Sequence, residues 1–313
     1  MLSVRRLLLP LLLVPSLILT ACAEREPAES APAGDSGDFP VELRPEGAPA
    51  VTLDQRPDRI VSLSPSTTET LYAVGAGEQV VAVDEMSTHP GRAPRTDLSG
   101  LSPDPESIAG HDPDLVIVQS DRDGTLADSL AETGIETLVL PAPGTLDGMY
   151  RQFELVGRAT GHAGAGAELA EETAAEIDEL VAAAPERTGE LSYYHELSPQ
   201  LHSVTSTTFI GQVYDRFGMT NIADQGDPGA HGGYPQLSAE RVLEADPDLI
   251  VLADTRCCGQ DADTVAQRPG WDTLTAVERD RVVGVDDDLA SRWGPRLVEF
   301  VRTVSDAVRR TDG

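Results

Sequence analysis

Residues 59–77 read RIVSLSPSTTETLYAVGAG and decide the fold. The apolar run at 60–63 is typical of a strand buried on both faces of a parallel sheet. The small hydroxyl residues at 64–68 supply a turn and helix N-cap candidates, and Glu69 falls in the first helical turn. The glycines at 75–77 end that helix. A strand that leads through hydroxyls into a helix N-terminus presents N–H groups and hydroxyls at its carboxyl end, where open α/β sheets bind ligands.

The same alternation of strand and helix patterns continues along the chain. Short apolar runs separated by helical patterns predict parallel strands in two successive groups, at 60–63, 80–83, 116–118 and 136–140, then at 191–195, 249–252 and 281–285. This alternation predicts an α/β fold with two Rossmann-like lobes, each built on a central parallel sheet with a ligand cleft between the lobes.

An internal repeat supports two similar lobes. LSPDPESIAGHDPDLVIV begins at Leu101 and LSAERVLEADPDLIVL begins at Leu237, and both read Leu-Ser, a short helix, Asp-Pro-Asp-Leu and a β run. Glu106 and Glu240 each stand six residues before Asp-Pro-Asp. Two distant copies indicate a duplicated lobe rather than a solenoid. The alternative is coincidence at a common helix-to-strand turn.

The segment between the two copies is strongly helical. Apolar residues recur at helical spacing from 146 to 184, and glycines at 161, 164 and 166 split the pattern. The part from 163 to 184 would be about 33 Å long as a helix, enough to run along both lobes and join them stiffly. We therefore predict a first lobe at 51–145, a linking helical segment at 146–188 and a second lobe at 189–313.

The first fifty residues predict export. Arg5 and Arg6 precede an apolar run, and Leu-Thr-Ala-Cys ends at Cys22, which resembles a bacterial lipoprotein signal at 1–21 with lipidation of Cys22. The alternatives are a plain signal peptide or a short membrane span, although the run is shorter than the roughly 20 residues that a span needs. The Pro-, Glu- and Ala-rich residues at 22–50 predict a disordered tether.

Charge limits the possible partners. The formal net charge of -30 argues against nucleic acid and against adhesion to anionic lipid. We therefore expect contact with the membrane through the lipid anchor only.

The motifs of common enzyme classes do not occur in the sequence. It has no Gly-x-Ser-x-Gly elbow, no His-Glu-x-x-His and no phosphate-binding loop. The irregular spacing of His89, His195, His202 and His231 favours scattered loop histidines over a metal site. We expect no enzyme activity, no cofactor and no resident metal, with an exported hydrolase as a weaker alternative.

The sequence resembles the iron-chelate and cobalamin periplasmic-binding family across residues 51–308. The resemblance rests on the segment at 59–77, the Asp-Pro-Asp-Leu repeats, the central helix and SRWGPRLVEF from Ser291. LSPSTTET and GGYPQLSAERVL are most similar to the vitamin B12-binding branch, although Tyr234 stands where that branch has Trp.

This resemblance implies a particular class of protein. It implies two lobes joined by one long backbone helix, and a monomeric substrate-binding protein that delivers a metal chelate to an ABC permease dimer with its ATPase. A corrinoid is the favoured ligand, and a ferric siderophore or haem is the alternative. A receptor that signals instead of delivering is a further alternative.

Loop residues at the strand carboxyl ends are the candidates for ligand contact. Two of them are aromatic and suit stacking on a flat macrocycle, although packing at a helix start is the competing interpretation. The predicted contacts are Ser64, Ser66, Thr67, Met86, His89, His202, Tyr234 and Trp293. The family resemblance also implies that Glu106 and Glu240 dock on permease arginines, whereas the competing interpretation is that both merely favour a helix N-terminus.

Cys257 and Cys258 are adjacent and follow a predicted strand. Three interpretations remain: a vicinal disulfide that shapes the cleft loop, a thiol pair that touches the metal centre, or a passive pair of small residues.

Overall fold

A computed structural model describes residues 39–185, 190–225 and 229–311. The predicted signal peptide, Cys22 and most of the predicted tether lie outside the described residues. Within the described ranges, none of the helices combines the length and the apolar character needed to cross a bilayer.

The first lobe contains a four-stranded parallel sheet, as predicted. Its strands are β3 (Ile60–Leu63), β4 (Val80–Val83), β5 (Leu115–Val118) and β6 (Glu136–Val139), in the order β4-β3-β5-β6. Every residue of β3 and β5 is buried, which explains their continuous apolar character. The helices of this lobe are α1 (Pro65–Ala73), α2 (Pro105–Ala109) and α3 (Thr125–Ala131).

The second lobe contains a parallel sheet of the same topology. Its strands are β7 (Leu191–Glu196), β8 (Met219–Asn221), β9 (Leu249–Leu252) and β10 (Val282–Gly284), in the order β10-β9-β7-β8. In both sheets the first strand in the chain lies between the second and the third, and the fourth lies beyond the third. The main helices are α6 (Phe209–Asp215), α7 (Ala239–Ala245), α8 (Thr255–Cys258), α9 (Ala262–Ala266), α10 (Thr275–Glu278), α11 (Asp287–Ala290) and α12 (Leu297–Arg310).

The Asp-Pro-Asp-Leu repeats hold matching places in the two sheets. The Oδ2 of Asp114 accepts hydrogen bonds from the backbone N–H groups of Asp58, at 2.8 Å, and Arg59, at 2.9 Å. The Oδ2 of Asp248 accepts hydrogen bonds from the N–H of Ser192, at 3.0 Å, and from its hydroxyl, at 2.9 Å. In each lobe the last aspartate of the repeat therefore fastens the segment that begins the first strand.

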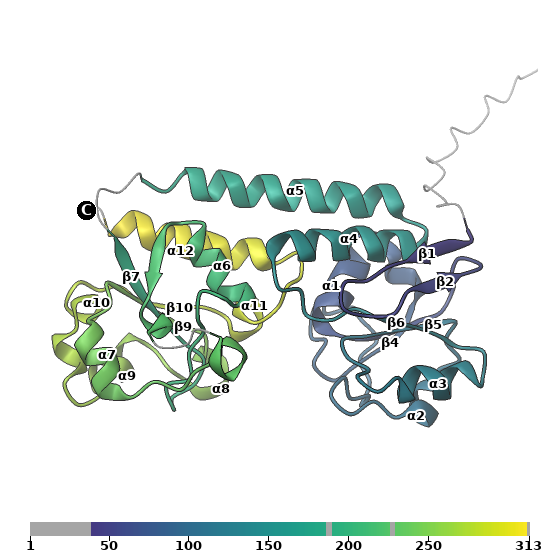
Figure 1. The fold of residues 1–313 in the computed structure, drawn as a ribbon, viewed down its shortest axis with the longest axis horizontal. Coiled ribbons are helices and arrows are strands. Elements are labelled where there is room, and N and C mark those ends of the chain that lie inside the picture. The colour runs from purple at the N-terminus through teal and green to yellow at the C-terminus, as the bar shows by residue number, and fades with distance from the viewer. Residues whose placement is uncertain (1–38, 186–189, 226–228, 312–313) are drawn as a thin grey trace, which may run out of the picture. The chain divides into compact units, whose positions relative to one another are not determined.

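The linking segment forms two helices, α4 (Leu146–Thr160) and α5 (Ala163–Ala182), and α5 is the long helix predicted at 163–184. The chain turns at Gly161, whose φ of 77° suits glycine. The other predicted break points, Gly164 and Gly166, lie inside α5. A Cβ on Gly157 would lie 2.8 Å from the Cα of Gly166, so glycines let α4 and α5 pack closely. α5 also packs against α12, and Figure 1 shows α5 running beside both helices.

α4 contributes to the cores of both lobes. Leu146, Met149 and Phe153 are buried in the core that contains β7 and β9. Val156 and Ala159, further along the same helix, are buried in the core that contains β3 and β5. One face of α4 therefore contributes to two hydrophobic cores in succession.

The predicted end of the tether at residue 50 was wrong. Val41–Leu43 form β1, which pairs antiparallel with β2 (Val51–Leu53). Leu43 is fully buried against the first lobe. Averaged composition hid this strand, because its alternation of apolar and polar residues is only three residues long.

Candidate functional site

A pocket of about 260 Å³ lies between loops of the two lobes. Residues after β3 and β4 form one wall, and α11 with the segment that follows it forms the other. The walls that come from the two sheets lie at the carboxyl ends of parallel strands, the usual ligand position in this architecture.

The start of α1 forms part of this pocket. Ser64 is the N-cap residue, and its Oγ accepts a hydrogen bond from the N–H of Thr67 at 3.4 Å. Both residues are buried and contribute to the helix start. Ser66 lines the pocket, and its Oγ accepts a hydrogen bond from the N–H of Trp293 at 3.2 Å. Ser66 and Trp293, both predicted ligand contacts, therefore join the two lobes here.

The loop after β4 supplies a third predicted contact. Met86 lines the pocket with 54% of its surface exposed, and its backbone oxygen accepts a hydrogen bond from Arg292 Nη2 at 3.0 Å. His89 lies on the same loop and is exposed, but it does not line the pocket.

His202 and Tyr234 lie near each other elsewhere on the second lobe. His202 pairs with Gln236 in an isolated β-bridge, and its Nδ1 lies 3.0 Å from the Oγ of Ser198. Tyr234 is 45% exposed. Neither side chain lines the pocket of about 260 Å³, so the structure gathers Ser66, Met86 and Trp293 at one place and this pair at another.

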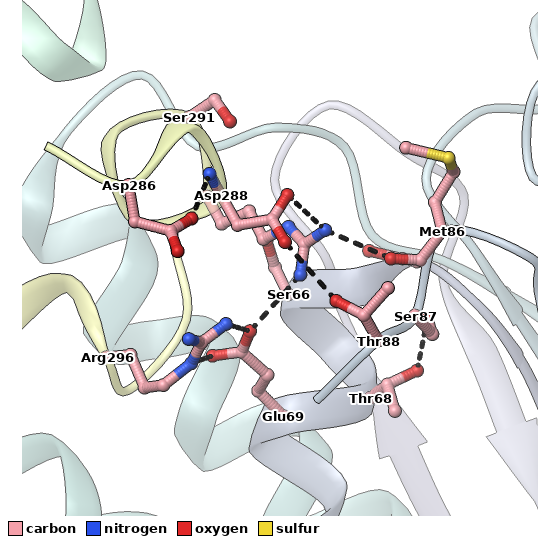
Figure 2. Close-up of polar contacts among 12 residues, drawn as sticks. Ser66, Thr68, Glu69, Met86, Ser87, Thr88, Asp286, Asp288, Ser291 and Arg296 are labelled. Atoms are coloured by element: carbon pink, nitrogen blue, oxygen red, sulfur yellow. Dashed lines mark hydrogen bonds and ion pairs between the residues drawn. The ribbon is translucent and has the colours of Figure 1, made fainter. Parts of the chain in front are cut away.

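An ion pair that the sequence did not suggest links the lobes beside the pocket (Figure 2). Glu69 accepts hydrogen bonds from Arg296 Nε at 3.0 Å and Arg296 Nη2 at 2.5 Å, while Arg292 Nη1 lies 3.5 Å from the same carboxylate. The Glu69 side chain is only 3% exposed. A Cβ on Gly294 would lie 3.0 Å from Glu69 Oε2, so glycine at this position leaves room for the pair. The motif SRWGPR carries both arginines, but it gives no sign of their partner in the other lobe.

Asp288 extends this polar network (Figure 2). Its Oδ1 accepts a hydrogen bond from Arg292 at 2.7 Å, and its Oδ2 accepts one from the hydroxyl of Thr88 in the first lobe at 3.2 Å. We call the set Glu69, Thr88, Asp288, Arg292 and Arg296 the interlobe latch. It holds the loops of both lobes together along one side of the pocket.

Asp84 lies in the pocket wall directly after β4. It is 2% exposed, and its Oδ1 has no hydrogen-bond partner among the described residues. Burial raises the pKa of this carboxyl group, while a hydrogen bond from Ser87 and the positive charge of Arg292 act in the opposite direction.

Cys257 and Cys258 are joined by a disulfide at the end of α8. The carboxylate of Asp287 accepts hydrogen bonds from the N–H groups of Arg256, at 3.0 Å, and Cys257, at 2.8 Å. Arg256 also forms an ion pair with Asp288 at 3.5 Å. The disulfide loop therefore packs against the acidic loop that carries part of the interlobe latch. Among the residues that the structure describes, no group of three or more His, Cys, Asp or Glu side chains could hold a metal ion.

Two buried carboxyl groups, those of Glu196 and Asp254, influence each other in the second lobe. Glu196 ends β7, and its two oxygens accept hydrogen bonds from Arg268 at 2.6 and 2.5 Å. Asp254 follows β9 and is fully buried, and burial together with the charge of Glu196 raises the pKa of Asp254 to about 7. Arg268 stacks on Trp271, 4.6 Å from the ring centroid. Trp271 itself is buried.

Glu106 and Glu240 occupy matching positions. Each is the second residue after a helix N-cap, Asp104 for α2 and Ser238 for α7, and each is exposed. The repeat therefore places one exposed glutamate at the same point of each lobe. Their proposed role at a transporter stays a prediction.

Comparisons with family models, curated proteins and solved structures all find binding proteins. Residues 60–289 match the family model described as periplasmic binding protein. The chain is 28% identical to an uncharacterized ABC transporter substrate-binding lipoprotein of Bacillus subtilis, YvrC, over 95% of both chains. It is 30% identical to a cobalamin-binding protein of Halobacterium salinarum, over 93% of this chain and 80% of that protein. Among solved structures, the apo periplasmic heme-binding protein RhuT of Roseiflexus sp. RS-1 is similar, with a TM-score of 0.69, 24% identity and coverage of 82% of this chain and 99% of that one.

Proposed function

The chain belongs to the periplasmic binding protein family, and from that premise we propose that it is the lipid-anchored receptor of an ABC importer for a corrinoid. In this proposal the two lobes hold the chelate at the carboxyl ends of their strands and present it to the permease without changing it chemically. The cobalamin-binding relative supports the choice of a corrinoid.

The distribution of exposed hydrophobic side chains is the observation that carries this proposal. Among the described residues, the exposed large hydrophobic side chains are Met86, Leu101 and Tyr234. The first two lie between β4 and α2, and Tyr234 lies between β8 and α7. These are the equivalent loops of the two lobes, because each follows the second strand and precedes the helix of the repeat. Apolar groups on two such loops suit a ligand with a large apolar face.

The charges at the pocket favour a corrinoid over haem. Asp84, Glu85 and Asp288 line the pocket, and Arg292 is already engaged by Asp288 and Glu69. A haem propionate would meet carboxylates there, whereas the amide side chains of a corrinoid carry no charge. The likeness to RhuT keeps haem as the second candidate, and a ferric siderophore stays the other alternative that the sequence resemblance implies.

We infer that the ligand contacts combine residues at the pocket with residues on the second lobe. Ser66, Met86 and Trp293 would contact one side of the chelate, and His202 and Tyr234 would reach it from the second lobe. A pocket of about 260 Å³ is smaller than a typical site for a drug-sized ligand, so it would take a substituent of the chelate rather than the whole macrocycle.

Calorimetric titration of the purified chain with cyanocobalamin, haemin and a ferric hydroxamate tests the proposal. We expect one equivalent of cyanocobalamin to bind, with a raised melting temperature and with unchanged ligand recovered afterwards. Binding of haemin or the hydroxamate alone would overturn the choice of ligand. Recovery of a chemically altered ligand would overturn the assignment as a binding protein.

A further inference from the structure

We propose that Asp84 is the residue that selects ligands by charge: its buried carboxylate accepts a hydrogen bond from an N–H donor of the chelate and excludes chelates that present a carboxylate. This inference rests on the proposed function, because it names the chemistry of the substituent that the pocket takes. Nothing in the sequence motifs singled out this residue.

The first argument is the unused hydrogen-bonding capacity of Asp84. Its side chain is buried, it lines the pocket, and its Oδ1 has no hydrogen-bond partner in the described part of the chain. Buried polar atoms in folded proteins are nearly always satisfied, because an unsatisfied one loses its hydration without compensation. An unsatisfied acceptor in a pocket wall is therefore well suited to a donor on the ligand.

The second argument is that the backbone that carries the carboxylate is held in place. The N–H of Asp84 donates to the backbone oxygen of Ser62 at 3.2 Å, and the N–H of Ser87 donates to the backbone oxygen of Asp84 at 3.2 Å. Gly100 packs on the other side, where a Cβ would lie 2.7 Å from Asp84 Oδ2. A rigid acceptor loses little freedom when a ligand binds, which favours recognition of one kind of group.

The third argument is the balance of charge at the pocket. Glu85 and Asp288 add two further carboxylates to the lining, and among the described residues Arg292 is the one basic residue that lines it. The Nη2 of Arg292 already donates to Asp288 and to the backbone oxygen of Met86, and its Nη1 lies 3.5 Å from Glu69. Arg292 Nη1 has no hydrogen-bond partner among the described residues, but the charge of Arg292 is already shared with Glu69 and Asp288. A ligand carboxylate near Asp84 would therefore meet three carboxylates and one cation that is already paired.

These constraints define the chemical class of the accepted group. A neutral carboxamide or a protonated amine offers the N–H donor that Asp84 lacks, whereas a carboxylate offers only acceptors. An amide and its acid have almost the same shape. Discrimination between them would therefore report the charge and the hydrogen-bonding pattern, not the size, of the site.

The test compares cyanocobalamin with its monocarboxylic acids, in which one side-chain amide is hydrolysed, for the wild type and Asp84→Asn. We expect the wild type to bind at least one of these acids about 100-fold more weakly than cyanocobalamin. In Asp84→Asn, which has nearly the same shape, that ratio should fall to below about tenfold, because the asparagine amide can donate to the ligand acid. Asp84→Ser provides a second uncharged variant if the asparagine variant folds poorly.

Glu85→Gln is the matched control. Glu85 is the neighbouring residue, lines the same pocket and is exposed, so this variant makes the same charge change without removing the buried acceptor. Equal loss of discrimination in Glu85→Gln would show that overall charge, not Asp84, selects the ligand and would overturn the inference. Unchanged discrimination in both Asp84 variants would also overturn it.

Failure of the proposed function can be told apart from failure of this inference, because it shows in the wild type and not in the comparison of variants. If the wild type binds haemin and no corrinoid, the corrinoid proposal fails. In that case the affinities of the wild type and Asp84→Asn are compared with haemin as the ligand, because its propionates are carboxylates. The inference then requires tighter haemin binding by Asp84→Asn than by the wild type, and equal or weaker binding would contradict it.

Discussion

Glu69 in α1 and Arg296, the residue before α12, are 227 positions apart in the chain and form a two-point ion pair between the lobes. The carboxylate is almost completely buried, and the guanidinium is 23% exposed. Removing one member of such a pair leaves the other charge buried and uncompensated, whereas an exposed pair contributes little.

Glu69→Ala should therefore lower the free energy of unfolding by about 3 kcal/mol. A double-mutant cycle with Arg296→Ala should give a favourable coupling energy above about 1 kcal/mol, measured by denaturant unfolding. The exposed pair of Arg302 and Glu176, which joins α12 to α5, is the control and should couple by less than about 0.5 kcal/mol. Equal coupling energies in the two cycles would contradict the claim that the buried pair in the interlobe latch stabilises the fold more than an exposed pair does.

Asp254 should make stability depend on pH. The folded state raises the pKa of this group from 3.8 to about 7, so between these values the folded chain keeps a proton that the unfolded chain releases. The free energy of unfolding should therefore fall as pH rises from about 4 to about 7, because the unfolded state binds fewer protons there.

Asp254→Asn removes this titration and can donate an N–H to Glu196. The variant should melt at a higher temperature than the wild type at about pH 8, and the difference should shrink toward about pH 4. Asp272→Asn makes the same change on an exposed residue and should show no such trend. A constant difference across the pH range would count against the assigned pKa.

Trp293 should report ligand binding by fluorescence. It lines the pocket, so its emission should be quenched by a coloured chelate bound there, whereas Trp271 is buried beneath Arg268. Trp293→Phe should lose most of the quench, and Trp271→Phe should retain it, provided that a melting curve shows that the second variant is folded. An undiminished quench in Trp293→Phe would place the chelate away from the pocket.

Glu106 and Glu240 should act at the transporter. Replacing both with arginine should abolish uptake in cells while leaving ligand affinity and melting temperature nearly unchanged, because both side chains are exposed. Glu132→Arg with Glu278→Arg reverses one exposed glutamate in each lobe and controls for the change in net charge. Normal uptake by the first pair would refute docking, and a large loss of stability would point to a role at the helix N-termini instead.

Cys22→Ala should release the protein from the membrane. The lipid on Cys22 is the proposed anchor, so fractionation of cells should move the variant to the soluble pool without changing ligand affinity. Replacement of the neighbouring Ala23 by Ser should leave the protein in the membrane fraction. Continued membrane association of Cys22→Ala would contradict lipidation at this residue.

The sequence predicted those parts of the fold that depend on local patterns. Buried strands such as β3 and β5 are continuous apolar runs, and the repeated Asp114 and Asp248 mark the same turn in both lobes. The pair of Glu69 and Arg296 could not be predicted, because their proximity depends on how the lobes pack and not on any spacing along the chain.

Hydroxyl residues illustrate the same limit at the site. Ser64 and Ser66 are neighbours of the same chemical type, yet one caps α1 and the other meets Trp293 across the pocket. A strand-to-helix turn needs hydroxyls for capping whether or not it binds a ligand. Sequence alone could therefore locate the loop that lines the pocket but could not divide its residues between these two tasks.

Because α4 contributes to the hydrophobic cores of both lobes, the stability of each lobe depends on the other. Its first turns complete one hydrophobic core and its last turns complete the other, so neither lobe can lose its fold without exposing apolar surface of its neighbour. We therefore expect the two lobes to unfold cooperatively, and a ligand that stabilises either lobe should protect both. A member of the periplasmic binding protein family that is built in this way should resist partial opening and the proteolysis that follows it.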